Sequence, residues 1–329
     1  MIPVVQRNYF IDFCKLLGLA LIILAHVGIT DWLKEIRNFD VPLMVFISGV
    51  LSVNSFARSK SVWDYLKKRF FRLLLPTWIF LTIYFVFLLF FSQKFPPLNI
   101  VLKSFLLQND SIGYVWIIRI YLMCAIIVPF AKKLCLFNKS WVFIGLVYLI
   151  YEVLYLLGIG VNCRIIESTL YYVIPYGVVL IFGMQYQNFS RKTCYVLCIS
   201  STLIFLSLEL FFYAQNNCFV FVQNFKYPPR ILYLSHAVMF ISFLMLFMNK
   251  KFSITNKYVL LASNSTLWIY LWHIMALLLV KKFLPESTHY VLKYFIVILI
   301  TLVIVFLQNK VVDYLERRKK YSFLKVFRG

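Results

Sequence analysis

Residues 9–28 read YFIDFCKLLGLALIILAHVG, an apolar run of twenty that also carries an acid, a base and an imidazole. Twenty residues of α-helix cover about 30 Å, which is the thickness of the hydrocarbon core of a bilayer. A cleaved signal peptide is not favoured, because Asp12 and Lys15 interrupt what would be its apolar region. We therefore expect residues 9–28 to form the first membrane-spanning helix.

The apolar character continues along the chain of 329 residues, of which 62% are apolar and 14% charged. Soluble domains are about half apolar and about a quarter charged, so a soluble globular protein and a disordered chain are both excluded. The prediction is an all-α, polytopic membrane protein with about ten transmembrane helices in a single domain over residues 1–329, ending in a short basic tail from about 310. The expected spans are 9–28, 41–57, 73–92, 113–131, 140–158, 170–184, 193–213, 231–248, 259–280 and 290–309.

The distribution of basic residues predicts the orientation. If the N-terminus lies in the cytoplasm, the segments on that side carry 22 Lys and Arg residues and those on the other side carry 9. The positive-inside rule then places both termini in the cytoplasm. The formal net charge of +22 is thus explained by topology and by contact with anionic lipids, and no nucleic-acid partner is expected.

Ionisable side chains at membrane depth cost roughly 2.5–3.5 kcal/mol each, so they are candidates for function. Lys15 and His26 are eleven residues apart, which brings them within about 20° of the same helical face and separates them by roughly 16 Å along the axis. Asp12 precedes Lys15 by three residues, so we expect an ion pair on that face. One interpretation is a neutralised pair that aids insertion together with an interfacial histidine, and the other is a cavity lined by all three.

A basic cluster, KKRFFR at residues 67–72, precedes the third expected span. Arg69 and Arg72 are three residues apart and lie on neighbouring helical faces. Two guanidiniums in this arrangement suit the oxygens of a phosphate group. The alternative is anchoring to anionic lipid headgroups, which any basic cluster at a cytoplasmic helix end provides.

Two further residues lie within spans near other polar groups. Arg119 follows Trp116 in the fourth span, where it either pairs with a carboxylate or extends to the interface. His273 follows the polar residues 263–265 by two to three helical turns and is a second candidate. We expect no metal site, because Cys194 and Cys198 have no His or acidic ligands near them in the sequence.

Taken in order, these segments resemble the membrane-bound acyltransferase family 3. Residues 7–15 are similar to the start of that family's first span, and Lys15 to His26 fits its basic-x(10)-His pattern. The stretch from Tyr114 to Ile118 departs from the His-Leu-Trp-Phe-Leu form that many members carry. Further similarity lies in Val41–Gly49, Arg69–Arg72 with Pro76, and Ser265–His273.

This resemblance implies transfer of an acyl group, usually acetyl from acetyl-CoA, to a hydroxyl of a cell-envelope glycan or its lipid-linked precursor. It implies that Arg69 and Arg72 bind the donor's phosphates from the cytoplasm, that Lys15 stands further in, and that His26 is the essential histidine. It also implies a bacterial inner membrane location. Some members add a C-terminal esterase-like domain, which we do not expect here because the sequence stops about 20 residues after its last span.

The expected mechanism has the pantetheine arm threading between helices towards His26, which acts as a general base or forms an acetyl-histidine. Asp12 would compensate Lys15, and Arg119 or Asn264 would stabilise the oxyanion. One alternative is a transporter or flippase of lipid-linked saccharides, although neither inverted halves nor a matched pair of broken helices is evident. Another is a non-catalytic membrane scaffold, which leaves the stripe of Asp12, Lys15 and His26 unexplained.

Overall fold

The computed structural model describes residues 7–91, 95–108, 111–134, 140–160, 163–247, 256–318 and 322–328, and it contains α- and 3₁₀-helices but no β-strand within these ranges. A helix occupies each of the ten expected spans: α1 (Tyr9–Ala25), α3 (Asp40–Ala57), α4 (Val62–Phe91), α6 (Trp116–Leu134), α7 (Ser140–Leu156), α9 (Leu170–Met184), α10 (Arg191–Asn216), α11 (Ile231–Leu246), α13 (Thr266–Phe283) and α14 (Tyr290–Arg318). Shorter helices connect them: α2 (Asp31–Arg37), α5 (Leu98–Phe105), α8 (Arg164–Ser168), η1 (Tyr186–Asn188), η2 (Val222–Phe225), α12 (Lys257–Asn264) and η3 (Ser322–Phe327).

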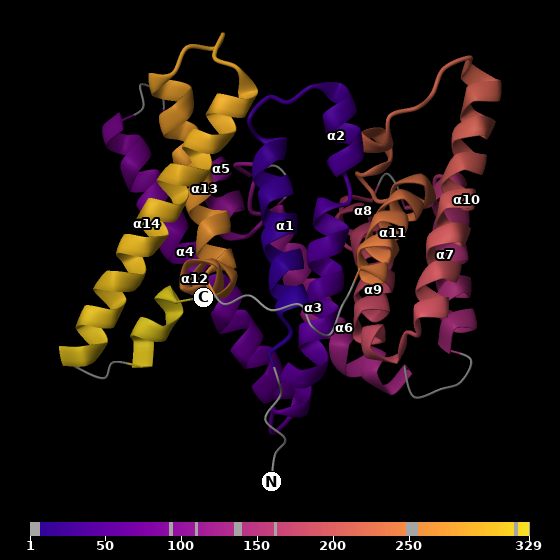
Figure 1. The fold of residues 1–329 in the computed structure, drawn as a ribbon, viewed down its shortest axis with the longest axis horizontal. Coiled ribbons are helices and arrows are strands. Elements are labelled where there is room, and N and C mark those ends of the chain that lie inside the picture. Colours follow the sequence, from indigo (N-terminus) through magenta and orange to yellow (C-terminus); the bar gives the residue numbers. More distant parts are fainter. Residues whose placement is uncertain are drawn as a thin grey trace.

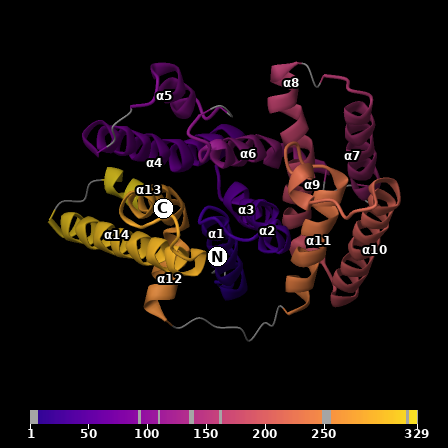
Figure 2. The same cartoon turned by 90° about the horizontal axis from the view of Figure 1, so that it is seen from above.

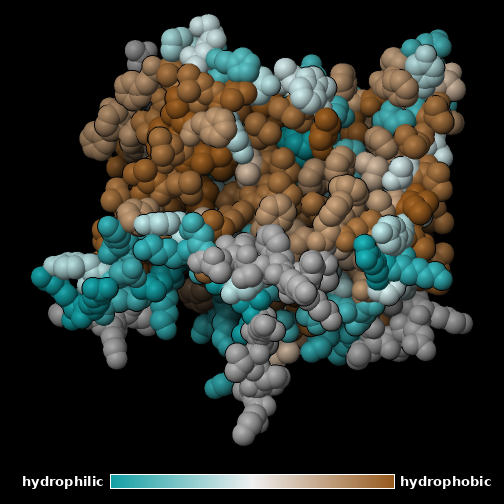
Figure 3. All heavy atoms as spheres, viewed as in Figure 1, coloured by the Kyte–Doolittle hydropathy of each residue, from teal (hydrophilic) through white to brown (hydrophobic). Residues whose placement is uncertain are grey.

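Six helical segments among the described residues are long and apolar enough to cross a membrane: 31–57, α4, 166–184, α10, α13 and α14. Helix α11 and most of α7 form shorter apolar helices. Figure 3 shows a broad hydrophobic band across one face, with hydrophilic residues gathered mainly along its lower edge. The all-α, polytopic character is confirmed, whereas the number of crossings and the side of the termini stay predictions.

The helices form two groups around a central pair, α1 and α3 (Figure 1). Helices α13, α14 and α4 lie on one side of the pair, and α9, α11, α10 and α7 lie on the other (Figure 2). Helix α1 contacts α3, α12, α13 and α14, while α3 contacts α9, α6 and α4. The functional candidates on α1 therefore lie in the middle of the molecule.

Two glycines let α3 and α9 touch backbone to backbone. A Cβ atom added at Gly49 would lie 2.1 Å from the carbonyl oxygen of Leu180, and one added at Gly183 would lie 2.0 Å from that of Phe46. Both distances are far below any van der Waals contact, so only glycine fits at either position. This reciprocal contact joins the central pair to the group that contains α9.

Helix α1 begins with Asn8 as its N-cap, whose side chain accepts hydrogen bonds from the backbone amides of Phe10 and Ile11. It ends at Ala25, three residues earlier than expected, with His26 as its C-cap. Gly28 has a φ of 77°, which turns the chain away towards α2. His26 therefore lies at the end of the helix rather than within it.

Candidate active site

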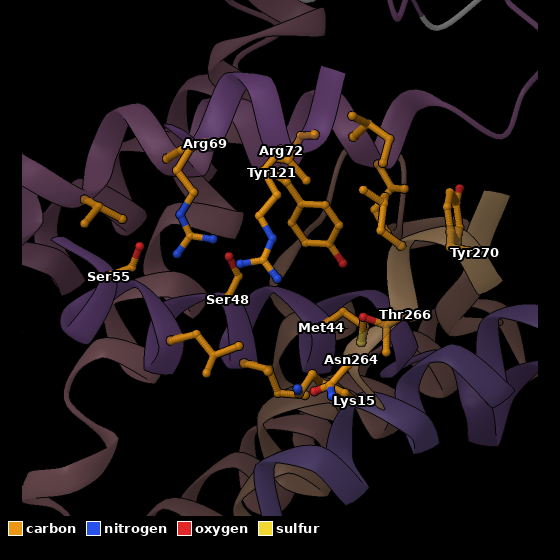
Figure 4. Close-up of a pocket in the computed structure, with 18 of the residues that line it drawn as sticks. Lys15, Met44, Ser48, Ser55, Arg69, Arg72, Tyr121, Asn264, Thr266 and Tyr270 are labelled. Carbon is orange, nitrogen blue, oxygen red and sulfur yellow. The ribbon is translucent and has the colours of Figure 1, made fainter. Parts of the chain in front are cut away.

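The first of two neighbouring cavities has a volume of about 320 Å³ and is called the basic cavity below. Four of its lining side chains are cationic: Lys15, Arg58, Arg69 and Arg72. Figure 4 shows Arg69 and Arg72 reaching from α4 across the cavity towards Ser48 and Ser55 on α3. The sequence analysis missed Arg58, whose only signal was a basic residue directly after the second span.

The arginines of the basic cavity have no carboxylate partner among the residues that the structure describes. Among the described residues, no ion pair includes Arg58, Arg69 or Arg72, whereas the neighbouring Lys68 binds Asp64 at 2.7 Å. Three guanidiniums that line one cavity without counter-charge attract an anion. Their planar donor groups match phosphate oxygens in particular. The cavity is thus suited to a phosphorylated ligand.

Lys15 enters the same cavity from α1 and is held by a buried carboxylate. Its Nζ lies 2.7 Å from Asp12 Oδ1, as the spacing of three residues predicted. Asp12 also binds Arg7 at 2.6 Å and accepts a hydrogen bond of 2.6 Å from the hydroxyl of Ser263. Asp12 is not among the residues that line the cavity. It therefore pairs with two cations and ties α1 to the end of α12.

A second cavity of about 190 Å³ contains His26 and is called the histidine chamber below. The Nδ1 atom of His26 lies 2.7 Å from the carbonyl oxygen of Ile22. A carbonyl oxygen only accepts hydrogen bonds, so Nδ1 carries the proton of the neutral ring. The lone pair is then on Nε2, which leaves that atom able to accept a proton from a ligand.

His273 lies beside His26, with 5.5 Å between the ring centroids. Its side chain is fully buried, and its Nδ1 atom contacts the carbonyl oxygen of Tyr270 one turn earlier on α13. Its Nε2 atom has no hydrogen-bond partner in the structure. The ring of Tyr114 packs on His26 as well, with 5.1 Å between centroids. The two histidines predicted as candidates, 247 residues apart in the sequence, thus share one site.

Three residues line both cavities: Ile22, Ile117 and Tyr270. The basic cavity and the histidine chamber are therefore adjacent, and these residues lie at the boundary between them. Tyr270 closes one side of the boundary, and its hydroxyl donates to the carbonyl oxygen of Tyr114. In Figure 4 it lies at the end of the basic cavity opposite Arg69. A long, thin ligand bound to the arginines would reach His26 across this boundary.

A family model described as an acyltransferase domain matches residues 8–308 of this sequence. The chain belongs to the acyltransferase 3 family. No curated protein and no solved structure matches it at a significant level. Membership confirms the resemblance drawn from the motifs and supports acyltransferase activity in an integral membrane protein.

This acyltransferase also has a buried charged cluster that the sequence analysis missed. Arg37 and Lys226 both contact the carboxylate of Asp40, Lys226 at 3.6 Å, and all three residues line the histidine chamber. Burial lowers the pKa of the Lys226 ammonium from its usual value, and the charge of Asp40 opposes that shift. The spacing of three residues between Arg37 and Asp40 was a usable signal, whereas nothing in the sequence linked Lys226 to them.

Two expected oxyanion donors do not lie with His26. Asn264 lines the basic cavity, and its side-chain oxygen accepts a hydrogen bond of 3.0 Å from Arg7. Arg119 is half-buried on α6 and is absent from the lining of both cavities. From the same segment Tyr114, Trp116 and Ile117 line the histidine chamber instead. A role for Arg119 at the reacting atoms stays a prediction that the cavity geometry does not support.

A further carboxylate within an apolar helix has structural partners. Glu152 on α7 binds Arg230 at 2.6 Å and accepts a hydrogen bond of 2.7 Å from Tyr148. Cys163 and Cys218 are both free and exposed. Within the described ranges, no group of three His, Cys, Asp or Glu side chains is arranged to hold a metal ion.

Proposed function

We propose that this acyltransferase moves an acetyl group from acetyl-CoA to a hydroxyl of a cell-envelope glycan or its lipid-linked precursor. The observation that carries the proposal is that Ile22, Ile117 and Tyr270 line both cavities. One of these cavities contains guanidiniums that have no carboxylate partner among the described residues, and the other contains His26. A donor of this kind has an anionic end and a reactive end far apart. The two cavities supply one site for each.

In this proposal the phosphates of acetyl-CoA bind Arg69 and Arg72, with Arg58 and Lys15 adding positive charge to the same cavity. Charge-assisted, bidentate hydrogen bonds make guanidinium–phosphate contacts strong. The uncharged pantetheine arm then passes Ile117 and Tyr270 and presents its thioester to the histidine chamber. Fixing both reactants in this way removes much of the entropic barrier to their reaction.

His26 is the proposed base. Its Nε2 atom removes the proton of the acceptor hydroxyl while that oxygen attacks the thioester carbonyl carbon. The tetrahedral intermediate then collapses, the carbon–sulfur bond breaks, and the departing CoA thiolate receives the proton from His26. A second route has Nε2 attack the thioester carbonyl first, so that the carbon–sulfur bond breaks, CoA leaves as the thiolate and an acetyl-histidine forms. The acceptor hydroxyl then attacks the acetyl carbon, the carbon–nitrogen bond breaks, and the hydroxyl proton passes through Nε2 to the CoA thiolate. Both routes need Nδ1 to keep its proton, which it donates in a hydrogen bond to the Ile22 carbonyl oxygen.

The proposal includes an orientation. With ten membrane crossings and both termini in the cytoplasm, Arg58, Arg69 and Arg72 follow or precede spans on the cytoplasmic side, where acetyl-CoA is made. His26 then lies towards the opposite leaflet, where a glycan acceptor would be reached. The bacterial inner membrane is the location that this arrangement and the family favour.

The test is an assay of purified protein in lipid nanodiscs with acetyl-labelled CoA thioester and a lipid-linked glycan fraction. Wild-type protein is expected to produce labelled glycan together with free CoA, and His26→Ala to produce neither above background. His236→Ala is the matched control, because His236 is also a buried histidine but packs against Phe205 and Phe240. Glycan movement in the absence of acetyl-CoA, with no acetylated product in its presence, would instead indicate a transporter.

A further inference from the structure

We infer that the histidine chamber is the acceptor subsite and that it binds one uncharged sugar ring through Arg37, Asp40 and Gln223. This inference rests on the proposed function, because it assigns the substrate class to the site where His26 would act. All three residues line the same chamber as His26. Its volume of about 190 Å³ suits a single sugar ring rather than several.

The charges around the chamber balance, which argues against an acidic acceptor. Within the lining, Arg37 and Lys226 are opposed by Asp40. Outside the lining, the carboxylate of Glu35 also attracts both cations and accepts a hydrogen bond of 2.5 Å from the backbone amide of Val222. The two cations thus have two carboxylates near them, one of which lines the chamber. A carboxylate or phosphate on the bound ring would meet no surplus positive charge, in contrast to a phosphate in the basic cavity.

Unpaired polar atoms in the chamber wall fit a polyol. Arg37 is 5% exposed, and its Nε donor has no hydrogen-bond partner. The side-chain oxygen of Gln223, an acceptor, is also buried without one. A sugar hydroxyl both donates and accepts, so a ring with several hydroxyls would pair with both after small side-chain rotations. A carboxylate group only accepts hydrogen bonds, so it could pair with Arg37 but not with the oxygen of Gln223.

The remaining wall of the chamber is aromatic. Trp116 and Tyr227 meet edge to face with 5.4 Å between their ring centroids, and Tyr114 packs on His26. All of them line the chamber. The C–H groups on one face of a pyranose ring pack well on aromatic surfaces, while its hydroxyls need polar partners at the edge. The lining of the chamber provides both aromatic rings and charged, hydrogen-bonding groups.

Sugar binding can be measured without acetyl-CoA, so it is independent of the transfer reaction. The probes are methyl pyranosides of glucose, galactose, mannose, rhamnose and N-acetylglucosamine, with methyl glucuronide as the charged comparison. Each is titrated by saturation-transfer NMR against the full chain in nanodiscs. The variant is Gln223→Ala, and its control is Gln187→Ala, an exposed glutamine on η1. Loss of one or two hydrogen bonds is expected to weaken binding about threefold to tenfold.

At least one neutral glycoside is expected to bind wild-type protein and Gln187→Ala equally, to bind Gln223→Ala more weakly, and to bind more tightly than the glucuronide. Binding of no neutral glycoside, or binding that Gln223→Ala leaves unchanged, overturns the inference, and so does tighter binding of the glucuronide. If acetyl transfer occurs while these titrations fail, only the acceptor assignment is wrong. If the titrations succeed but no acetyl transfer is found, the proposed reaction is wrong and the sugar site stands.

Discussion

His26 and His273 pack against each other with 5.5 Å between their ring centroids, and each places its Nδ1 atom against a backbone carbonyl of its own helix. One ring closes the end of α1, and the other is fully buried within α13. The position of the first ring therefore depends on the second. His273 is a positioning residue in this account, because only His26 lines the histidine chamber.

Replacement of His273 by Ala removes the ring that supports His26. We expect kcat for acetyl transfer to fall by about tenfold to a hundredfold, because misplacement of a catalytic group by about 1 Å has effects of that size. The KM for acetyl-CoA is expected to stay within about twofold, since the arginines are untouched. Steady-state kinetics with varied acetyl-CoA separates the two parameters. An unchanged kcat would show that His26 does not need this neighbour.

Arg69→Ala and Arg72→Ala are each expected to raise the KM for acetyl-CoA by about tenfold to a hundredfold. Each substitution removes charge-assisted hydrogen bonds worth about 1.5–3 kcal/mol. Arg72→Lys should recover only part of the loss, because an ammonium cannot bind phosphate bidentately. The control is Lys68→Ala on the same helix, whose side chain is 62% exposed and pairs with Asp64. An equal rise in the KM for acetyl-CoA in Lys68→Ala would mean that positive charge anywhere on this helix is sufficient for donor binding.

Two Asp–Lys pairs at the same spacing differ in burial and allow a matched test of stability. Asp12 binds Lys15 at 2.7 Å with its side chain 6% exposed, and Asp31 binds Lys34 at 2.8 Å with its side chain 73% exposed. Loss of one partner of a buried pair costs about 3–5 kcal/mol, whereas an exposed pair contributes about 0–1 kcal/mol. Asp12→Asn should therefore lower the thermal unfolding midpoint by many degrees, and Asp31→Asn should leave it nearly unchanged.

The glycine contact between α3 and α9 makes a second stability prediction. Gly183→Ala would place a methyl group 2.0 Å from the carbonyl oxygen of Phe46, so the two helices must separate. Forced overpacking of this kind typically costs about 1–3 kcal/mol, and a backbone atom cannot move aside as a side chain can. Gly145→Ala on α7 is the control, because nothing lies within 4 Å of its added methyl group. Thermal unfolding in detergent should show a lower midpoint for Gly183→Ala alone.

Local spacing made much of the site predictable from the sequence. The spacing of eleven positions from Lys15 to His26 placed both on one face of a helix, and the structure has Lys15 in the basic cavity and His26 in the adjoining chamber. The spacing of three positions from Asp12 to Lys15 predicted an ion pair that is present. These relationships depend only on helical geometry, which an apolar run of that length specifies.

Contacts between distant segments were not predictable in this way. The hydroxyl of Ser263 reaches Asp12 across 251 residues, and Lys226 reaches Asp40 from the loop after η2. Helix packing brings these groups together, and apolar helices have many packing arrangements of similar hydrophobic burial. The early end of α1 at Ala25 depended on the backbone conformation of Gly28, which spacing does not reveal.

The central claim is that one donor molecule extends from the paired arginines to His26, past Ile117 and Tyr270. A structure determined with S-acetonyl-CoA, in which a ketone replaces the reactive thioester, measures this directly. We expect the phosphates to contact Arg69 and Arg72 and the ketone carbon to lie within about 4 Å of His26 Nε2. Phosphates bound away from both arginines, or a ketone held outside the histidine chamber, would contradict the account.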